Sequence, residues 1–228
     1  PPIVVEGPEP DGDATDDDAP DGDTSAEDDV SWIPVGVDFA PGLGFSTAFG
    51  WHQRRVVSLG VLGSLTRDVY GVALSSVVDL TLRDVRGVQL AGVLAYADSV
   101  SGWQGSGVVA VASNRVAGVQ SSVLNVAPTL RGAQLGVANI ASSVAGLQLG
   151  VLNVAAEVEG TQLGVANIAA GRVRGVQVGL FNYADDADAQ IGLVNIAARG
   201  RTHLRADGDS TGLFGVSLVH GQVTHTIV

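Results

Sequence analysis

The chain lacks three residue types that carry much of protein chemistry. Its 228 residues contain no cysteine and no methionine, and all 12 basic residues are arginine, so lysine is absent as well. Without cysteine there is no disulfide and no thiol nucleophile, and without lysine there is no Schiff base. Aromatic residues make up only 5% of the chain, which is unusual for a globular core, whereas 31 glycines indicate backbones that approach one another closely.

Basic charge is also scarce, and the two signs of charge are unevenly placed. Residues 1–30 hold 12 of the 24 acidic residues and no arginine, so residues 31–228 carry 12 acids against 12 arginines. No basic stripe is present, which argues against nucleic-acid binding. Because the chain begins with Pro1 rather than methionine, we expect that a leader was removed, as export would require.

Residues 1–30 form an acidic arm rich in Asp, Gly and Pro, a composition typical of a disordered linker. Calcium is the alternative, because hard cations bind clustered carboxylates. The candidate ligands are Asp11, Asp13, Asp16 and Asp18. The spacing does not match an EF-hand loop, and we expect no other cofactor.

Residues 31–70 are expected to form an N-terminal cap. Five of the eight Trp and Phe residues fall in this segment, and a bulky segment of this kind can cover the open edge of a stacked β-structure. Residues 201–228 are expected to provide a C-terminal strand or cap.

Residues 71–200 contain an internal repeat. Gln recurs at intervals of 13 to 16 residues, and from the third copy onward Asn follows each Gln by five residues. A pattern that stays in phase through so many copies indicates a repeat architecture. The residues expected to form a structural ladder are Gln120, Gln134, Gln148, Gln162, Gln177 and Gln190, with Asn125, Asn139, Asn153, Asn167, Asn182 and Asn195.

We number one unit from its leading glycine, so that residues 146–159 occupy positions 1 to 14. Aliphatic residues recur at positions 4, 6, 9 and about 13, and charged residues at positions 12 and 14. Positions 4, 6 and 8 share one side of an extended chain, as do 9, 11 and 13, so a corner is predicted beside the Asn at position 8. Two short strands and two corners per unit predict an all-β fold, a narrow β-solenoid with coils of roughly 14 residues. Stacking at about 4.8 Å would then let the Asn column pass hydrogen bonds between coils.

Position 7 is expected to face outward, because it shares its parity with the Gln at position 3 and the Gly at position 5. It is apolar in every copy, and a long exposed apolar stripe requires cover by another protomer, by lipid or by the arm. The residues expected at this interface are Leu124, Leu152, Phe181 and Val194, together with Ile3, Val4 and Val5 of the arm. The opposite parity, with this stripe in the core, remains open.

Two membrane folds compete with the solenoid. Residues 132–156 carry no charge and are long enough for a membrane helix, but their phased Gln and Asn residues and their many β-branched residues disfavour one. An outer-membrane β-barrel stays open as an alternative, although aromatic girdles are missing from most repeats.

The unit Gly-Leu-Gln-Leu-Gly-Val-Leu-Asn-Val-Ala at residues 146–155 resembles the surface-repeat proteins common in myxobacteria, Leptospira and Bacteroidetes. Those proteins carry arrays of Gly-x-Gln-(Ile/Leu)-Gly-x-x-Asn-x-Ala, and the resemblance covers roughly residues 71–200. It implies an exported bacterial protein at the cell surface or in the extracellular space. Residues 87–117 depart from the motif, with Ala95 and Ala110 near the expected Asn positions.

No arrangement of residues in the sequence indicates catalysis. The four histidines lack an obvious third metal ligand, and the acidic group at residues 185–188 stands where other coils are charged too. We therefore expect a structural, non-enzymatic protein that self-associates as a homo-oligomer or polymer, side by side or end to end through strand addition by the arm. Membrane association without a spanning helix is compatible with this interpretation. A binding module for a polysaccharide or protein partner is the alternative.

Overall fold

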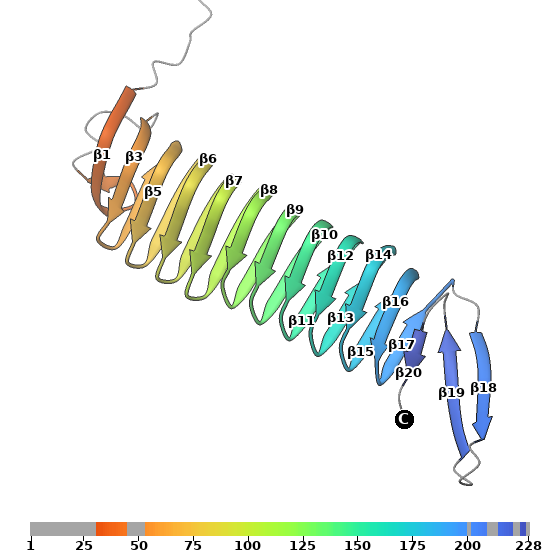
Figure 1. Ribbon diagram of the computed structural model, residues 1–228. Coiled ribbons are helices and arrows are strands. Elements are labelled where there is room, and N and C mark those ends of the chain that lie inside the picture. Colours follow the sequence, from red (N-terminus) through yellow and green to blue (C-terminus); the bar gives the residue numbers. More distant parts are fainter. Residues whose placement is uncertain (1–30, 45–52, 200–201, 209–213, 221–223, 227–228) are drawn as a thin grey trace, which may run out of the picture.

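The computed structural model of the chain describes residues 31–44, 53–199, 202–208, 214–220 and 224–226 (Figure 1). Every regular element in these segments is a β-strand, and the strands wind into a rod of stacked parallel coils. Each coil takes about 15 residues, and the rod has about 10 turns. The predicted all-β solenoid is confirmed.

The strands change in length along the rod. The first coils contain β1 (Ser31–Ala40), β2 (Leu43–Gly44), β3 (Gln53–Gly60), β4 (Gly63–Thr66) and β5 (Asp68–Ser75). Long strands follow, namely β6 (Val78–Ala91), β7 (Leu94–Ser106), β8 (Val109–Ser121), β9 (Leu124–Leu135) and β10 (Ala138–Leu149). Later coils divide into a short and a longer strand, giving β11 (Leu152–Ala155), β12 (Glu157–Leu163), β13 (Ala166–Ala169), β14 (Arg172–Val178), β15 (Phe181–Ala184), β16 (Asp186–Gly192) and β17 (Val194–Ala197).

Parallel pairing brings equal positions of successive coils together. Gln148, for example, lies between Gln134 of the preceding coil and Gln162 of the following one. In the coil of residues 146–159 the chain turns sharply at Gly150–Val151 and bends again at Ala156. The short strand therefore holds positions 7 to 10, and the longer strand runs from position 12 to position 4 of the next unit.

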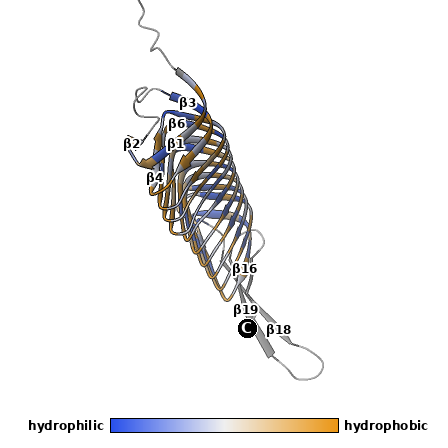
Figure 2. Ribbon diagram, turned by 90° about the vertical axis from the view of Figure 1, so that its left-hand side faces the viewer, coloured by the Kyte–Doolittle hydropathy of each residue, from blue (hydrophilic) through white to orange (hydrophobic). Residues whose placement is uncertain are grey.

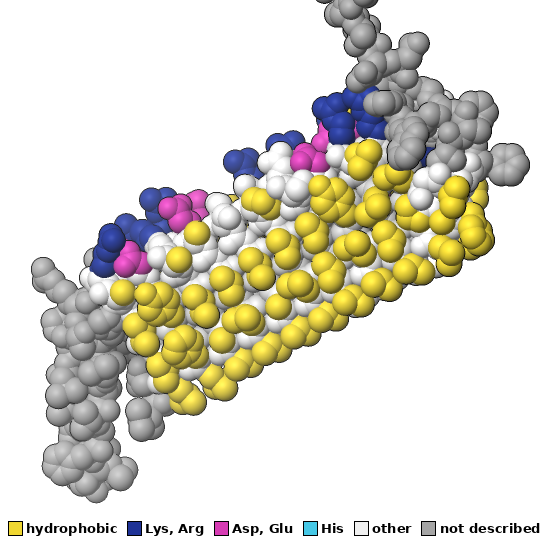
Figure 3. Space-filling view, turned by 180° about the vertical axis from the view of Figure 1, so that it is seen from behind, with side chains coloured by type: hydrophobic (Ala, Val, Ile, Leu, Met, Phe, Trp, Pro, Cys, Tyr) yellow, Lys and Arg dark blue, Asp and Glu magenta, His cyan; other side chains and the backbone are white. Residues whose placement is uncertain are grey.

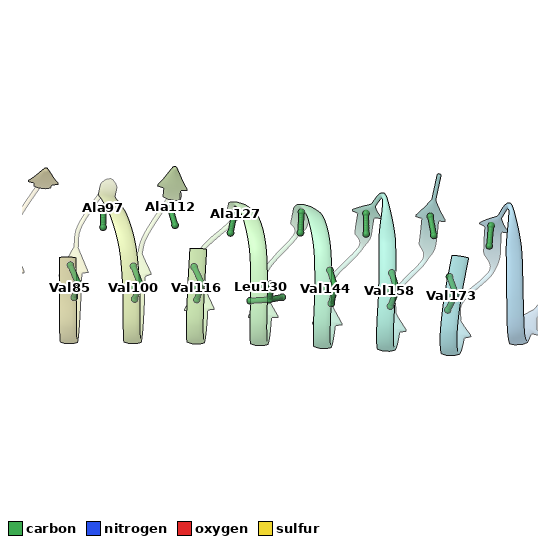
Figure 4. Close-up of a cluster of buried hydrophobic side chains, with 14 of the residues drawn as sticks. Val85, Ala97, Val100, Ala112, Val116, Ala127, Leu130, Val144, Val158 and Val173 are labelled. Atoms are coloured by element: carbon green, nitrogen blue, oxygen red, sulfur yellow. The ribbon is translucent and has the colours of Figure 1, made fainter. Parts of the chain in front are cut away.

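The interior is filled by four columns of side chains. Gln occupies position 3, Asn position 8, Ala position 10 and a β-branched residue or Leu position 13, and these columns are buried. Figure 4 shows the two apolar columns, with Val100, Val116, Leu130 and Val144 stacked along one line. Small side chains suit these columns because a coil of this length encloses only a narrow space, which must be packed without voids.

The structure corrects the predicted facing of the first strand. Positions 4 and 6 were expected inside, yet Leu149 is 46% exposed and Val151 is 51% exposed. Gln148, expected outside, is fully buried. The side chains at positions 3, 8 and 10 (Gln, Asn and Ala) all face inward. Positions 3 and 8 differ in parity, so the corner lies between them, at Gly150–Val151, rather than beside Asn153. Position 9 was likewise expected inside, on the same side as position 13, yet Ile140 is 40% exposed. Both expectations were wrong because every aliphatic column was assumed to face the core.

The glycine at position 1 is required by the close approach of successive coils. Gly146 has φ of +140°, a value that residues with a side chain rarely adopt. A Cβ atom placed there would also collide with the carbonyl oxygen of Gly132 in the preceding coil. This glycine column therefore sits within the long strand and lets the coils stack.

The two ends of the rod differ. Parallel stacking begins before the recognisable repeat, because β1 pairs with β3 and β3 pairs with β5, all within residues 31–75. At the other end β18 (Thr202–Gly208) and β19 (Phe214–His220) form an antiparallel hairpin. β20 (Thr224–Thr226) then returns to pair in parallel with β16, so residues 201–228 contribute strands to that end.

Candidate functional site: internal amide ladders and an apolar outer surface

The glutamines form a continuous hydrogen-bonded column inside the rod. Each side-chain nitrogen donates to the side-chain oxygen of the Gln in the preceding coil, at 2.7–3.0 Å. The column contains the six predicted residues and extends to two earlier ones, Gln104 and Gln89. Buried amides are costly unless paired, and stacking of identical coils pairs each amide with its own copy.

The asparagines form a second column with the opposite polarity. Each nitrogen donates to the oxygen of the Asn in the following coil, at 2.7–2.8 Å from Asn125 to Asn195. The same nitrogen also reaches a backbone carbonyl at position 4, as from Asn153 to Leu163 at 2.8 Å. The Asn column therefore also satisfies carbonyl groups next to the sharp turn.

Asp79 lies at the first end of the Gln column. It occupies the Asn position of an early coil, opposite Ala95, and accepts a hydrogen bond of 2.7 Å from Gln89 Nε2. A carboxylate can only accept, so Gln89 must present its nitrogen to Asp79 and its oxygen to Gln104. The later Gln side chains have the same orientation, and their nitrogens also donate to backbone carbonyls, as from Gln120 to Val126 at 3.2 Å.

Burial raises the pKa of Asp79 above its ordinary value of 3.8. Hydrogen bonds from Gln89, Ser64, Ser75 and Thr81 act against this rise, because they stabilise the charged carboxylate. Ser64 and Ser75 both donate to Oδ2 at 2.7 Å. Asp79 is therefore a buried acid with an unusually complete set of donors.

A second buried charge lies at the start of the rod. Arg55 pairs with Asp38 at 2.5 Å, and both side chains are almost wholly buried. The guanidinium also donates to Gln53 Oε1 at 3.0 and 3.2 Å and to Ser58 Oγ at 3.1 Å. A buried ion pair of this kind is tolerated only when further hydrogen bonds surround it.

The sequence did not lead us to predict these buried ionic groups. A signal did exist for Asp79, which precedes Gln89 by ten residues, close to the nine residues that separate Asn139 from Gln148. Asp38 and Arg55 precede the recognisable repeat, and no spacing in the sequence pairs them.

The outer surface of the rod is apolar over two faces and the edge where they meet. We call the column at position 6 the ridge; its members include Val123, Val137, Val151, Val165, Leu180 and Leu193, which are all exposed. The flanks of the ridge are positions 2 and 4 on one face and positions 7 and 9 on the other. The hydrophobic colouring in Figure 2 follows the lower turns of the coils, and Figure 3 shows unbroken apolar rows over the face and its edge.

The predicted interface residues belong to one flank. At position 7, Leu152, Phe181 and Val194 are 36%, 37% and 46% exposed, and Leu124 is half-buried. The stripe thus faces outward, and Gln, which was predicted to share that side, faces inward. The remaining predicted residues, Ile3, Val4 and Val5 and the candidate calcium ligands Asp11, Asp13, Asp16 and Asp18, lie outside the described residues.

Charged side chains gather on the edge away from the ridge, which we call the charged edge (Figure 3). They stand mainly at positions 12 and 14 and bear both signs. Arg172 lies 3.6 Å from both Asp186 and Asp188, and Arg199 lies 3.0 Å from Asp185. The small acidic group singled out in the sequence is therefore balanced by arginines.

Among the described residues no group of three or more His, Asp or Glu side chains is placed to hold a metal ion. No helix in the same part of the chain is long and apolar enough to cross a membrane. A shallow apolar groove runs beside Leu59, Val61, Leu74 and Leu90, and it continues the apolar surface rather than enclosing a cavity. What the geometry offers is a long contact surface.

Comparison with known proteins finds no similar one. No protein-family model, no curated protein and no solved structure matches the chain.

Proposed function

We propose that the protein is a structural element that self-associates through the ridge and its flanks. The observation that carries this proposal is the length of the apolar surface, which follows every coil from the Leu59 region to Leu193. Monomeric soluble proteins rarely leave such a surface open to water. Burying it against a second copy removes that cost.

The area of one flank is sufficient for a stable contact. About 10 coils at roughly 4.8 Å give a rod of about 48 Å, and a flank of four residues is about 13 Å wide. Two copies would then bury on the order of 1,200 Å² in total, at the lower end of the standard size for specific interfaces. Since each rod has two flanks, association need not stop at a dimer.

The proposed setting is the cell surface or the extracellular space of a bacterium. This part rests on the resemblance of the Gly-x-Gln-Leu-Gly-x-x-Asn-x-Ala units to bacterial surface-repeat proteins. Filament growth through strand addition by Ile3, Val4 and Val5 is a further part of the proposal, and it rests on the sequence of the arm alone.

Sedimentation velocity over a range of concentrations tests the proposal. We expect the wild-type chain to associate in water, and Val123→Glu with Val151→Glu to weaken association at least tenfold, because charge on the ridge must be desolvated. Both positions are exposed, so the fold should be retained.

A matched control uses the charged edge. Ala117→Glu with Ala145→Glu adds the same charge close in sequence to the ridge substitutions, at exposed positions that both neighbour Arg131 in the stack. This variant should associate as the wild type does. A wild-type chain that stays monomeric at high concentration would refute the proposed function.

A further inference from the structure

We propose that the ridge and its flanks are seated in the hydrocarbon layer of one leaflet of a lipid bilayer, with the rod lying along the membrane and the charged edge in water. This inference goes beyond the proposed function: the apolar surface that associates with a second copy in water is covered by lipid instead where a bilayer is present. It adds the chemical class of the partner.

The first argument is the shape of the apolar surface. The ridge and both flanks are apolar, so the surface wraps around an edge instead of forming one flat patch (Figure 3). A second rod covers one flank and leaves the other flank open. Hydrocarbon chains are fluid and cover both flanks and the ridge at once.

The second argument is depth. Four residues separate position 2 from the ridge, which is about 13 Å of extended chain. One leaflet provides about half of the roughly 30 Å hydrocarbon core. The apolar zone therefore matches a single leaflet, and the charges at positions 12 and 14 remain above it.

The third argument is the placement of Tyr and Trp. Register pairing puts Tyr96 and Tyr183 at position 9, the outer limit of one flank. Trp103 stands at position 2, the outer limit of the other flank, where its indole N–H donates to Ser121 Oγ at 2.8 Å. Trp32 and Tyr70 stand in the columns of positions 12 and 14. Among the described residues no Tyr or Trp lies at the ridge or beside it, where Val, Leu, Ile, Ala and Phe181 predominate and Gly105 and Ser121 interrupt the position-4 column. Tyr and Trp prefer the boundary between hydrocarbon and headgroups, since each ring has an apolar body and a polar atom.

The fourth argument is the backbone of the ridge. Hydrocarbon tolerates no unpaired N–H group. In the coil that contains Val151, the N–H groups of residues 150, 151 and 152 donate to carbonyls of Leu163 and Val137 at 2.9–3.0 Å. The Val151 carbonyl accepts from Val165 and Ala166 in the next coil at 3.0 and 2.9 Å. The N–H groups of this turn and the Val151 carbonyl are thus paired with neighbouring coils, which meets the main requirement of a turn exposed to lipid.

Because the chain has no cysteine, single labels can test the inference on the full protein. Val151→Cys places a polarity-sensitive fluorophore on the ridge, and Ala145→Cys places it at the charged edge; both sites are exposed. Each labelled protein is mixed with phosphatidylcholine vesicles that carry a nitroxide quencher on the acyl chain. We expect a blue shift and several-fold stronger quenching at residue 151 than at residue 145.

Equal quenching at both sites, or none at residue 151, would overturn the lipid inference. Sedimentation of the same two proteins without vesicles separates this failure from failure of the proposed function. Association in water without quenching refutes the lipid partner and leaves self-association standing. Neither association nor quenching refutes both, and circular dichroism of the labelled proteins checks that the β-fold is intact.

Discussion

The first coils and the later coils fill the same narrow interior with different polar chemistry. The early coils bury the ion pair of Asp38 with Arg55 and the carboxyl group of Asp79 among hydroxyl groups. From β9 onward the buried polar groups are the uncharged amides of Asn and Gln, beside columns of Ala and mostly Val.

The difference shows what a stacked repeat permits. An amide carries a donor and an acceptor, so it can pair with an identical copy about 4.8 Å away, without limit along the rod. A charge cannot be repeated in this way, because like charges at that distance repel in a medium of low polarity. Among the described residues the buried charges, namely Asp38 with Arg55, Asp68 and Asp79, therefore lie in the first coils and do not recur along the rod. Asp79 joins the two regions through Gln89.

The largest expected effect comes from removing one partner of the ion pair. Arg55→Met leaves Asp38 buried without its cation, and we expect a loss of about 3–5 kcal/mol in the free energy of unfolding. Urea denaturation followed by circular dichroism measures it. The double variant Asp38→Leu with Arg55→Met should recover most of the loss, because no unpaired charge remains. A single variant as stable as wild type would contradict this difference between the two regions.

An intermediate effect is expected from interrupting the neutral ladder. Asn153→Ala removes the donor to the Leu163 carbonyl, the acceptor of the Asn139 amide and the donor to Asn167. Leaving buried polar atoms unsatisfied costs about 1–3 kcal/mol. Val154→Ala is the control, since it trims the adjacent, half-buried side chain without touching the ladder. Equal losses in the two variants would show that the ladder contributes nothing beyond packing.

The smallest effect is a pH dependence at the junction of the two regions. The pKa of Asp79 is raised on folding, so the folded state holds the proton more tightly. Its contribution is fully present below the unfolded pKa and is lost as pH rises from about 3.8 through the folded pKa. Asp79→Asn cannot titrate at this position. The free energy of unfolding of the wild type, minus that of the variant, should therefore fall as pH rises through this window and stay constant above it. Urea midpoints of both proteins across the acid range provide the measurement, and a difference that grows with pH would contradict the assignment.

The repeat explains why so much of the fold was predictable. The spacing of Gln134, Gln148 and Gln162 predicted stacked coils, and the ladders follow once equal positions are in register. The side that each strand turns inward was not predictable by the same reasoning. In an alternating strand either the Gln residues or the neighbouring Leu and Val residues can face the core. The sequence pattern is the same in both cases.

By itself the sequence determined the coil length, the phase of Gln and Asn, a recurring need for glycine, and the separation of charge from apolar residues. It placed the glycines at the corners, whereas the structure shows that the glycine of closest approach, as at Gly146, lies within the long strand. Only the tertiary structure decided that Gln faces inward together with Asn, and that the aliphatic residues at positions 4 and 6 face outward. The physical reason is that a buried amide costs free energy when it has no hydrogen-bond partner, and this cost is removed when an identical amide lies one coil away. That neighbour exists only after the coils have stacked, and the same stacking turns scattered Val and Leu residues into one continuous apolar ridge.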